Sequence, residues 1–174
     1  MKNIFYILFI LPIFIFGQNK VGDSCVLQLE NIKWKKTFEN ATSKKSKLEL
    51  ILNKIINDST YKVYKPKIHI AGSLYPKSFD KDGNDCGVKI LFILNYSKKE
   101  SIILDLSKNP KYNFITNQLS DENIKNIQTV FDSNSAQSLY GTLGKSGVVL
   151  LTTDNKNFIK QIREFLKKER AKNK

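Results

Sequence analysis

The chain is poor in the residues on which most catalytic and metal sites are built. Its 174 residues include one histidine and two cysteines. The histidine, His69, lies in residues 67–70, where apolar and polar residues alternate as in a strand. No Ser-His-Asp set and no histidine-rich metal cluster can be built from it. We therefore expect a protein that is not an enzyme and that uses no cofactor or metal.

The two cysteines leave several possibilities open. Cys25 and Cys86 are far apart in the sequence, and in an oxidising compartment the simplest expectation for such a pair is a disulfide. Two buried thiols or one exposed thiol are the alternatives. A thiol enzyme that combines either cysteine with His69 is a remote third, because nothing in the spacing brings a base to a nucleophile.

Acidic residues are few relative to basic ones. Lysine and arginine number 29 against 16 aspartates and glutamates, a formal net charge of +13. One interpretation is a cationic surface for anionic lipid, lipopolysaccharide or an acidic partner; the other is ordinary solvated lysine faces in a biased composition. The lysines are not interleaved with arginines or stacking aromatics, so we expect no nucleic-acid partner.

Only one long apolar run occurs, and it lies at the N-terminus. Residues 1–3 carry a lysine, residues 4–16 are apolar apart from Pro12, and residues 17–19 are small or polar. This order is typical of a secretory signal peptide, here residues 1–18, with an uncleaved anchor as the alternative. We therefore expect export to the periplasm or an outer-membrane-associated location, and a mature single domain over residues 19–174.

The mature chain predicts an α+β fold. Apolar residues recur at steps of three and four in residues 44–57, which predicts a helix capped by Thr42 or Ser43. Strands are predicted at residues 26–32, 61–64, 67–71, 87–96 and 101–106, the last two forming a hairpin. The strand at 87–96 is apolar enough to be covered on both faces. Residues 157–174 predict a terminal amphipathic helix, with residues 169–174 frayed. Its apolar stripe suits the domain's own sheet or, alternatively, a membrane surface or partner.

Two further motifs do not predict the sites that they suggest. Gly144-Lys145-Ser146 lacks the first glycine of a phosphate loop and precedes a strand. The acidic run at residues 80–85 has its glycine too early for a calcium loop and fits a polar turn better.

A glycine-spaced segment near the C-terminus is the most specific pattern in the chain. Residues 139–153 read Leu-Tyr-Gly-Thr-Leu-Gly-Lys-Ser-Gly-Val-Val-Leu-Leu-Thr-Thr. This pattern resembles the signature of plug domains of TonB-dependent outer-membrane receptors, in the SusC-like branch. Leu143 stands where the family usually has an arginine. The chain is too short to add a transport barrel.

The resemblance covers residues 101–153 and implies a β-α-β-α-β order. Residues 103–105 correspond to the family's Val-Asp-Gly region, but Leu106 replaces the glycine of its tight turn. A helix is then expected to begin after Ser120, a strand at residues 127–131, a helix at residues 133–140 capped by Asp132, and a final strand after Gly147.

The resemblance also implies a function by binding. An outer-membrane receptor or an energy-coupling component is the expected partner, and the contact residues are expected in the glycine segment: Tyr140, Thr142, Leu143, Lys145 and Ser146. Gly141, Gly144 and Gly147 are expected to shape the turn. The alternative function is a basic protein that associates with anionic lipid or lipopolysaccharide.

Overall fold

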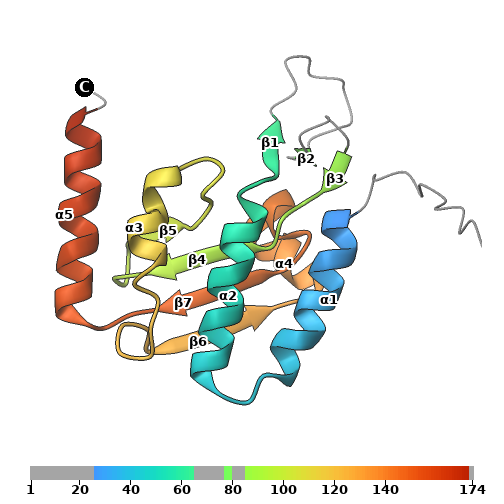
Figure 1. Cartoon of the computed structure of the whole chain (residues 1–174), viewed down its shortest axis with the longest axis horizontal. Helices are drawn as coiled ribbons and strands as arrows, with labels where there is room; N and C mark the ends of the chain where they lie inside the picture. Colours follow the sequence, from blue (N-terminus) through green and yellow to red (C-terminus); the bar gives the residue numbers. More distant parts are fainter. Residues whose placement is uncertain (1–25, 65–76, 80–84, 173–174) are drawn as a thin grey trace, which may run out of the picture.

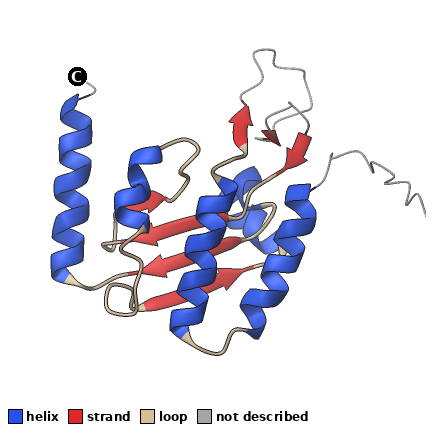
Figure 2. Cartoon of the chain, viewed as in Figure 1, coloured by secondary structure: helices blue, strands red, loops and turns tan. Residues whose placement is uncertain are grey.

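The computed structural model describes residues 26–64, 77–79 and 85–172. Figure 1 labels its helices and strands, and Figure 2 colours them by type. The helices are α1 Val26–Asn40, α2 Lys44–Asp58, α3 Asn113–Thr116, α4 Ser133–Tyr140 and α5 Lys156–Lys172, with the 3-10 helices η1 Pro110–Tyr112 and η2 Gly141–Gly144. The strands are β1 Lys62–Tyr64, β2 Lys77–Phe79, β3 Asp85–Gly87, β4 Leu91–Asn95, β5 Ser101–Ile103, β6 Asn126–Val130 and β7 Val148–Thr152.

The described strands form two sheets. The main sheet has the order β5-β4-β7-β6, in which β4 and β7 are parallel and the two outer strands run antiparallel to their neighbours. A smaller antiparallel sheet has the order β1-β2-β3. The mixture of helices with a mixed sheet confirms the α+β class predicted from the sequence.

The central strands β4 and β7 are covered on both faces, as their apolar sequences predict. Phe92 and Leu94 face a large core, which also receives side chains from α1, α2, α3 and α5. Leu91 and Ile93 face a second, smaller cluster that includes Ala136 of α4. Figure 1 shows α1 and α2 crossing one face of the sheet and α4 lying on the other.

The helix α2 is confirmed at its predicted place, but the strand predicted at residues 26–32 is wrong. The Ser43 side chain accepts a hydrogen bond from the Ser46 N–H and begins α2. Residues 26–32 instead open the helix α1, because the buried positions Leu27, Asn31 and Phe38 follow a helical spacing. Alternating apolar residues in the first turns concealed that spacing.

The helix predicted after Ser120 is also wrong. Residues 121–123 form a single turn, and the helical segment lies earlier, at η1 and α3. The Ile124 N–H and the Asn123 N–H both bond to the Ser120 carbonyl oxygen, so one turn forms there. It cannot continue because Lys125 already donates its N–H to Thr152 of β7. The chain is thus drawn into β6 at Asn126.

The turn after β5 forms with Leu106 in place of the glycine of the plug-domain pattern. Asp105 accepts hydrogen bonds from the Ser107 N–H at 3.0 Å and from the Ser107 hydroxyl at 2.6 Å. Leu106 does not need a positive φ, since in the described residues only glycines have one. The hydrogen bonds of the Asp105 side chain therefore stabilise this turn in the absence of a glycine.

The remaining predicted elements agree with the structure except at their ends. β5 stops at Ile103, so the predicted strand 101–106 is too long, although the hairpin with β4 is confirmed. The terminal helix α5 packs Phe158 and Ile162 into the large core and continues to Lys172. The frayed tail expected at residues 169–174 stays a prediction. The predicted strand at residues 67–71 and the signal peptide at residues 1–18 lie outside the described residues. Among the helices that the structure describes, none is long and apolar enough to cross a membrane.

Candidate functional site

The candidate site is the corner where α4 ends and the chain turns through η2 into β7. The Asp132 carboxylate caps α4 by accepting a hydrogen bond from the Ser135 N–H at 2.7 Å, and this bonding lowers the pKa of Asp132. Gly141 ends α4 with φ +61° and ψ −150°, a conformation that is essentially restricted to glycine. The Ser133 hydroxyl donates to the Lys145 carbonyl oxygen at 3.0 Å and ties the start of the corner to its end.

Two further glycines allow the corner to close tightly. A Cβ atom on Gly144 would lie 2.3 Å from the carbonyl oxygen of Ala136, so η2 packs directly on the α4 backbone. Gly147 has φ +97°, and a Cβ there would lie 3.1 Å from Phe131. The three glycines predicted to shape this turn therefore do so by two different means, conformation at Gly141 and Gly147 and close approach at Gly144.

The residues predicted to contact a partner do not share one environment. Tyr140 and Leu143 are half-buried and pack on the smaller apolar cluster of the sheet. Thr142 is half-buried and Lys145 is exposed. Part of the corner is therefore accessible, at Thr142 and Lys145, while Tyr140 and Leu143 also stabilise it.

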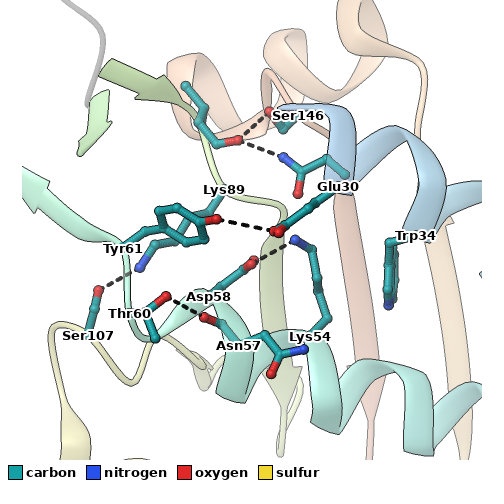
Figure 3. Close-up of polar contacts among 12 residues, drawn as sticks. Glu30, Trp34, Lys54, Asn57, Asp58, Thr60, Tyr61, Lys89, Ser107 and Ser146 are labelled. Carbon is teal, nitrogen blue, oxygen red and sulfur yellow. Dashed lines mark hydrogen bonds and ion pairs between the residues drawn. The ribbon is translucent and has the colours of Figure 1, made fainter. Parts of the chain in front are cut away.

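Ser146 has a structural role that the sequence did not reveal. Its hydroxyl donates to the Val88 carbonyl oxygen at 2.5 Å, and the Asn31 side-chain amide donates to the same oxygen at 3.0 Å. These bonds connect the corner, the segment before β4 and the helix α1, as Figure 3 shows. The hydroxyl of Ser146 is therefore used within the domain.

Leu139 is the exposed residue of the corner that the prediction missed. It is 68% exposed, the most of the large apolar side chains in the described residues. The signal was present, because α4 turns Ala136 and Tyr140 toward the sheet and leaves Leu139 on the outside. Tyrosine is enriched at protein interfaces, and Leu139 extends the apolar surface of the corner beside Tyr140.

A polar cluster lies beside the corner, between α1, α2 and the start of β4 (Figure 3). Lys54 and Asp58 form an ion pair at 2.7 Å, and both side chains are only 5% exposed. Burial raises the pKa of Asp58, and the positive charge of Lys54 opposes that shift. The second carboxylate oxygen of Asp58 has no hydrogen-bond partner among the described residues.

A second ion pair closes the end of β5 against the segment before β4. Lys89 donates to the Ser107 hydroxyl at 2.7 Å and to the Asp105 carboxylate at 3.3 Å. Burial lowers the pKa of Lys89. Burial would also raise the pKa of Asp105, but its hydrogen bonds from Ser107 and the charges of Lys89 and Lys108 outweigh that effect and lower it.

These charged groups line a small cavity of about 60 Å³, to which Leu143 of η2 also contributes. Asp58, Lys89, Asp105 and Lys108 supply its polar wall, and the rest is mainly apolar. The space suits a few solvent-sized molecules rather than an organic substrate. Each of the two carboxylates is paired with a lysine: the Lys54–Asp58 pair lies within α2, and the Lys89–Asp105 pair joins the segment before β4 to the turn after β5.

The other sequence candidates do not meet at this site. Cys25 and His69 lie outside the described residues, and of Cys86 only the backbone, in β3, is described. The disulfide therefore stays a prediction. Within the described ranges, no group of three or more histidine, cysteine, aspartate or glutamate side chains is placed to hold a metal ion.

Comparison of the chain with protein-family models, with curated proteins and with solved structures found no match. The resemblance to receptor plug domains therefore remains an interpretation of residues 101–153.

Proposed function

We propose that this chain is an exported, non-enzymatic protein of the cell envelope that acts by protein–protein binding near the outer-membrane uptake machinery. Two features of the sequence support the location: the signal-peptide pattern at residues 1–18 and the plug-like glycine segment at residues 139–153. The partner is an outer-membrane receptor or an energy-coupling component.

The observation that carries the proposal is the closely packed, partly apolar corner of α4 and η2. Leu139 and Lys145 are exposed on a turn whose backbone is held by Gly144 against Ala136 and by the Ser133–Lys145 hydrogen bond. A surface that is already ordered before it meets a partner loses little conformational entropy on binding. The corner therefore suits a shape-driven contact.

The alternative, association with anionic lipid or lipopolysaccharide, is favoured by the basic residues of α5. Of its seven basic residues, five recur at helical spacing: Lys156, Lys160, Arg163, Lys167 and Arg170. The apolar side of the same helix is buried in the core through Phe158 and Ile162. Hence α5 has no free apolar side for insertion, and attraction to a bilayer would rest on charge alone.

Affinity capture with matched variants tests the proposal. The tagged chain is expressed in the cells that produce it and recovered from their envelope at low and high salt. Leu139→Asp and Lys145→Glu alter the corner. Leu29→Asp and Lys36→Glu make the same chemical changes at exposed positions of α1. We expect a receptor or energy-coupling protein to be recovered at both salt concentrations, lost with the corner variants and kept with the α1 variants.

Two results would overturn the proposal. One is recovery of the same partner with corner and α1 variants alike. The other is recovery of only anionic lipid that is lost at high salt, because screening at high ionic strength removes charge-driven association while it leaves a shape-driven contact largely intact. The second result would favour the lipid-binding alternative.

A further inference from the structure

An open groove of about 650 Å³ runs between the first half of α5 and the ends of β4 and β7. The two strands are parallel neighbours that end side by side, with Asn95 paired to Thr152. The floor includes Tyr96, which is buried, and Ile159, which is half-buried. Clefts at the carboxyl ends of parallel strands are frequent ligand sites, so this groove is a candidate binding site.

The groove has a surplus of positive charge. Four basic residues line it, Lys98, Lys156, Lys160 and Arg163, against the two acidic residues Asp154 and Glu164. Both acids already have basic neighbours, because Asp154 lies 2.6 Å from Lys125 and Glu164 lies 4.0 Å from Lys160. With the described residues, Lys98 and Lys156 form no ion pair.

Arg163, which lines the groove, already binds one carboxylate of the chain itself. The guanidinium of Arg163 donates two hydrogen bonds to one carboxylate oxygen of Glu100, at 2.6 Å from Nη2 and 3.2 Å from Nε. The contact lowers the pKa of Glu100. A carboxylate can therefore reach this side of α5, whereas Lys98 and Lys156 have no comparable counter-charge among the described residues.

We propose that this groove binds an acidic segment of a partner protein, with apolar side chains on the floor and carboxylates at Lys98, Lys156 and Lys160. The inference deepens the proposed function, on which it rests for the class of partner, but it concerns a surface distinct from the α4–η2 corner. A narrow peptide can enter a concave groove, whereas a flat bilayer reaches mainly its rim. Charge complementarity and groove shape together therefore favour a peptide.

A synthetic peptide of alternating glutamate and leucine, labelled with a fluorophore, tests the proposal on the full mature chain. Lys98→Glu/Lys156→Glu reverses two charges in the groove. Lys33→Glu/Lys36→Glu reverses two exposed charges on α1 and is the matched control. Because each exposed charge contact contributes modestly, we expect the groove variant to bind on the order of tenfold more weakly by fluorescence anisotropy, and the α1 variant to bind as the wild type does. Lys98→Gln/Lys156→Gln, which only neutralises the charges, should give an intermediate loss.

Three outcomes would overturn the proposal. The peptide does not bind the wild type, or both charge-reversal variants weaken it equally, so that only net charge matters. In the third outcome, vesicles of phosphatidylcholine and phosphatidylglycerol bind the wild type but not the groove variant, while both proteins bind the peptide equally well. Leu139→Asp should leave peptide binding unchanged, so failure at the groove is distinguishable from failure at the corner. The thermal unfolding midpoint of each variant identifies losses that come from misfolding.

Discussion

The two faces of the main sheet are covered in different ways. One face carries α1, α2, α3 and α5 over a large core, and the other carries α4 and η2 over a small one. On the first face, large side chains fill the space between helices and strands. On the second, η2 lies on the α4 backbone itself at Gly144 and Ala136. We call the first the thick face, which depends on buried apolar volume, and the second the thin face, which depends on close approach of backbones. The thin face leaves Leu139 and Ile103 exposed.

The largest expected effect tests this comparison at two adjacent residues of β7. Leu151 is 0% exposed on the thick face, and Leu150 is half-buried on the thin face. Leu151→Ala should lower the free energy of unfolding by about 4 kcal/mol, since it leaves a cavity in a packed core. Leu150→Ala should cost about 1 kcal/mol, because its site can relax toward solvent. Urea unfolding of both variants measures the difference, and equal losses would contradict the two-face description.

The helices and strands were predictable where their apolar residues form a clear pattern. Apolar residues at steps of three and four predicted α2, and a continuous apolar run predicted that β4 is covered on both faces. Prediction failed at α1, where only Leu27, Asn31 and Phe38 are buried and apolar residues such as Leu29 are exposed. It failed after Ser120 because a long-range pairing with Thr152 overrides a good local helix start. Local sequence does not contain that competition.

The candidate site was predictable only in its backbone. The glycine spacing indicated a tight turn, and all three glycines have a physical reason in the structure. The spacing could not show that Ser146 bonds to Val88, 58 positions earlier in the chain. The pairing of Lys89 with Asp105 and the groove beside α5 likewise depend on segments distant in sequence. Such contacts are set by the packing of whole elements.

Gly144→Ala breaks the thin face at the point where it is tightest. The added methyl group would overlap the Ala136 carbonyl oxygen, so α4 and η2 must separate. We expect a loss of about 3 kcal/mol in the free energy of unfolding, measured by urea denaturation. A second change, Ala136→Gly, should not restore stability, because the obstacle is backbone rather than the Ala136 side chain. Restoration by the double variant would contradict the backbone contact.

A smaller effect is expected at the cavity between α2 and the turn after β5, which is lined by Asp58 and Asp105. The ordinary pKa of each carboxyl is 3.8, and folding shifts the two pKa values in opposite directions. Burial raises the pKa of Asp58, so the folded chain keeps a proton that the unfolded chain loses. Its contribution to stability is present below pH 3.8 and is lost as the pH rises through the folded-state pKa. Asp105 has a lowered pKa, so its contribution is present above pH 3.8 and is lost as the pH falls through the folded-state value.

Asp58→Asn and Asp105→Asn separate the two carboxylates. The free energy of unfolding is measured by urea denaturation from about pH 3 to about pH 7, where each unit of difference between folded and unfolded pKa changes it by about 1.4 kcal/mol. The stability difference between wild type and Asp58→Asn should fall as the pH rises, and that between wild type and Asp105→Asn should increase. If both stability differences instead increase with pH, burial does not dominate at Asp58. The charge of Lys54 would then keep the Asp58 carboxylate ionised and lower its pKa, as happens at Asp105.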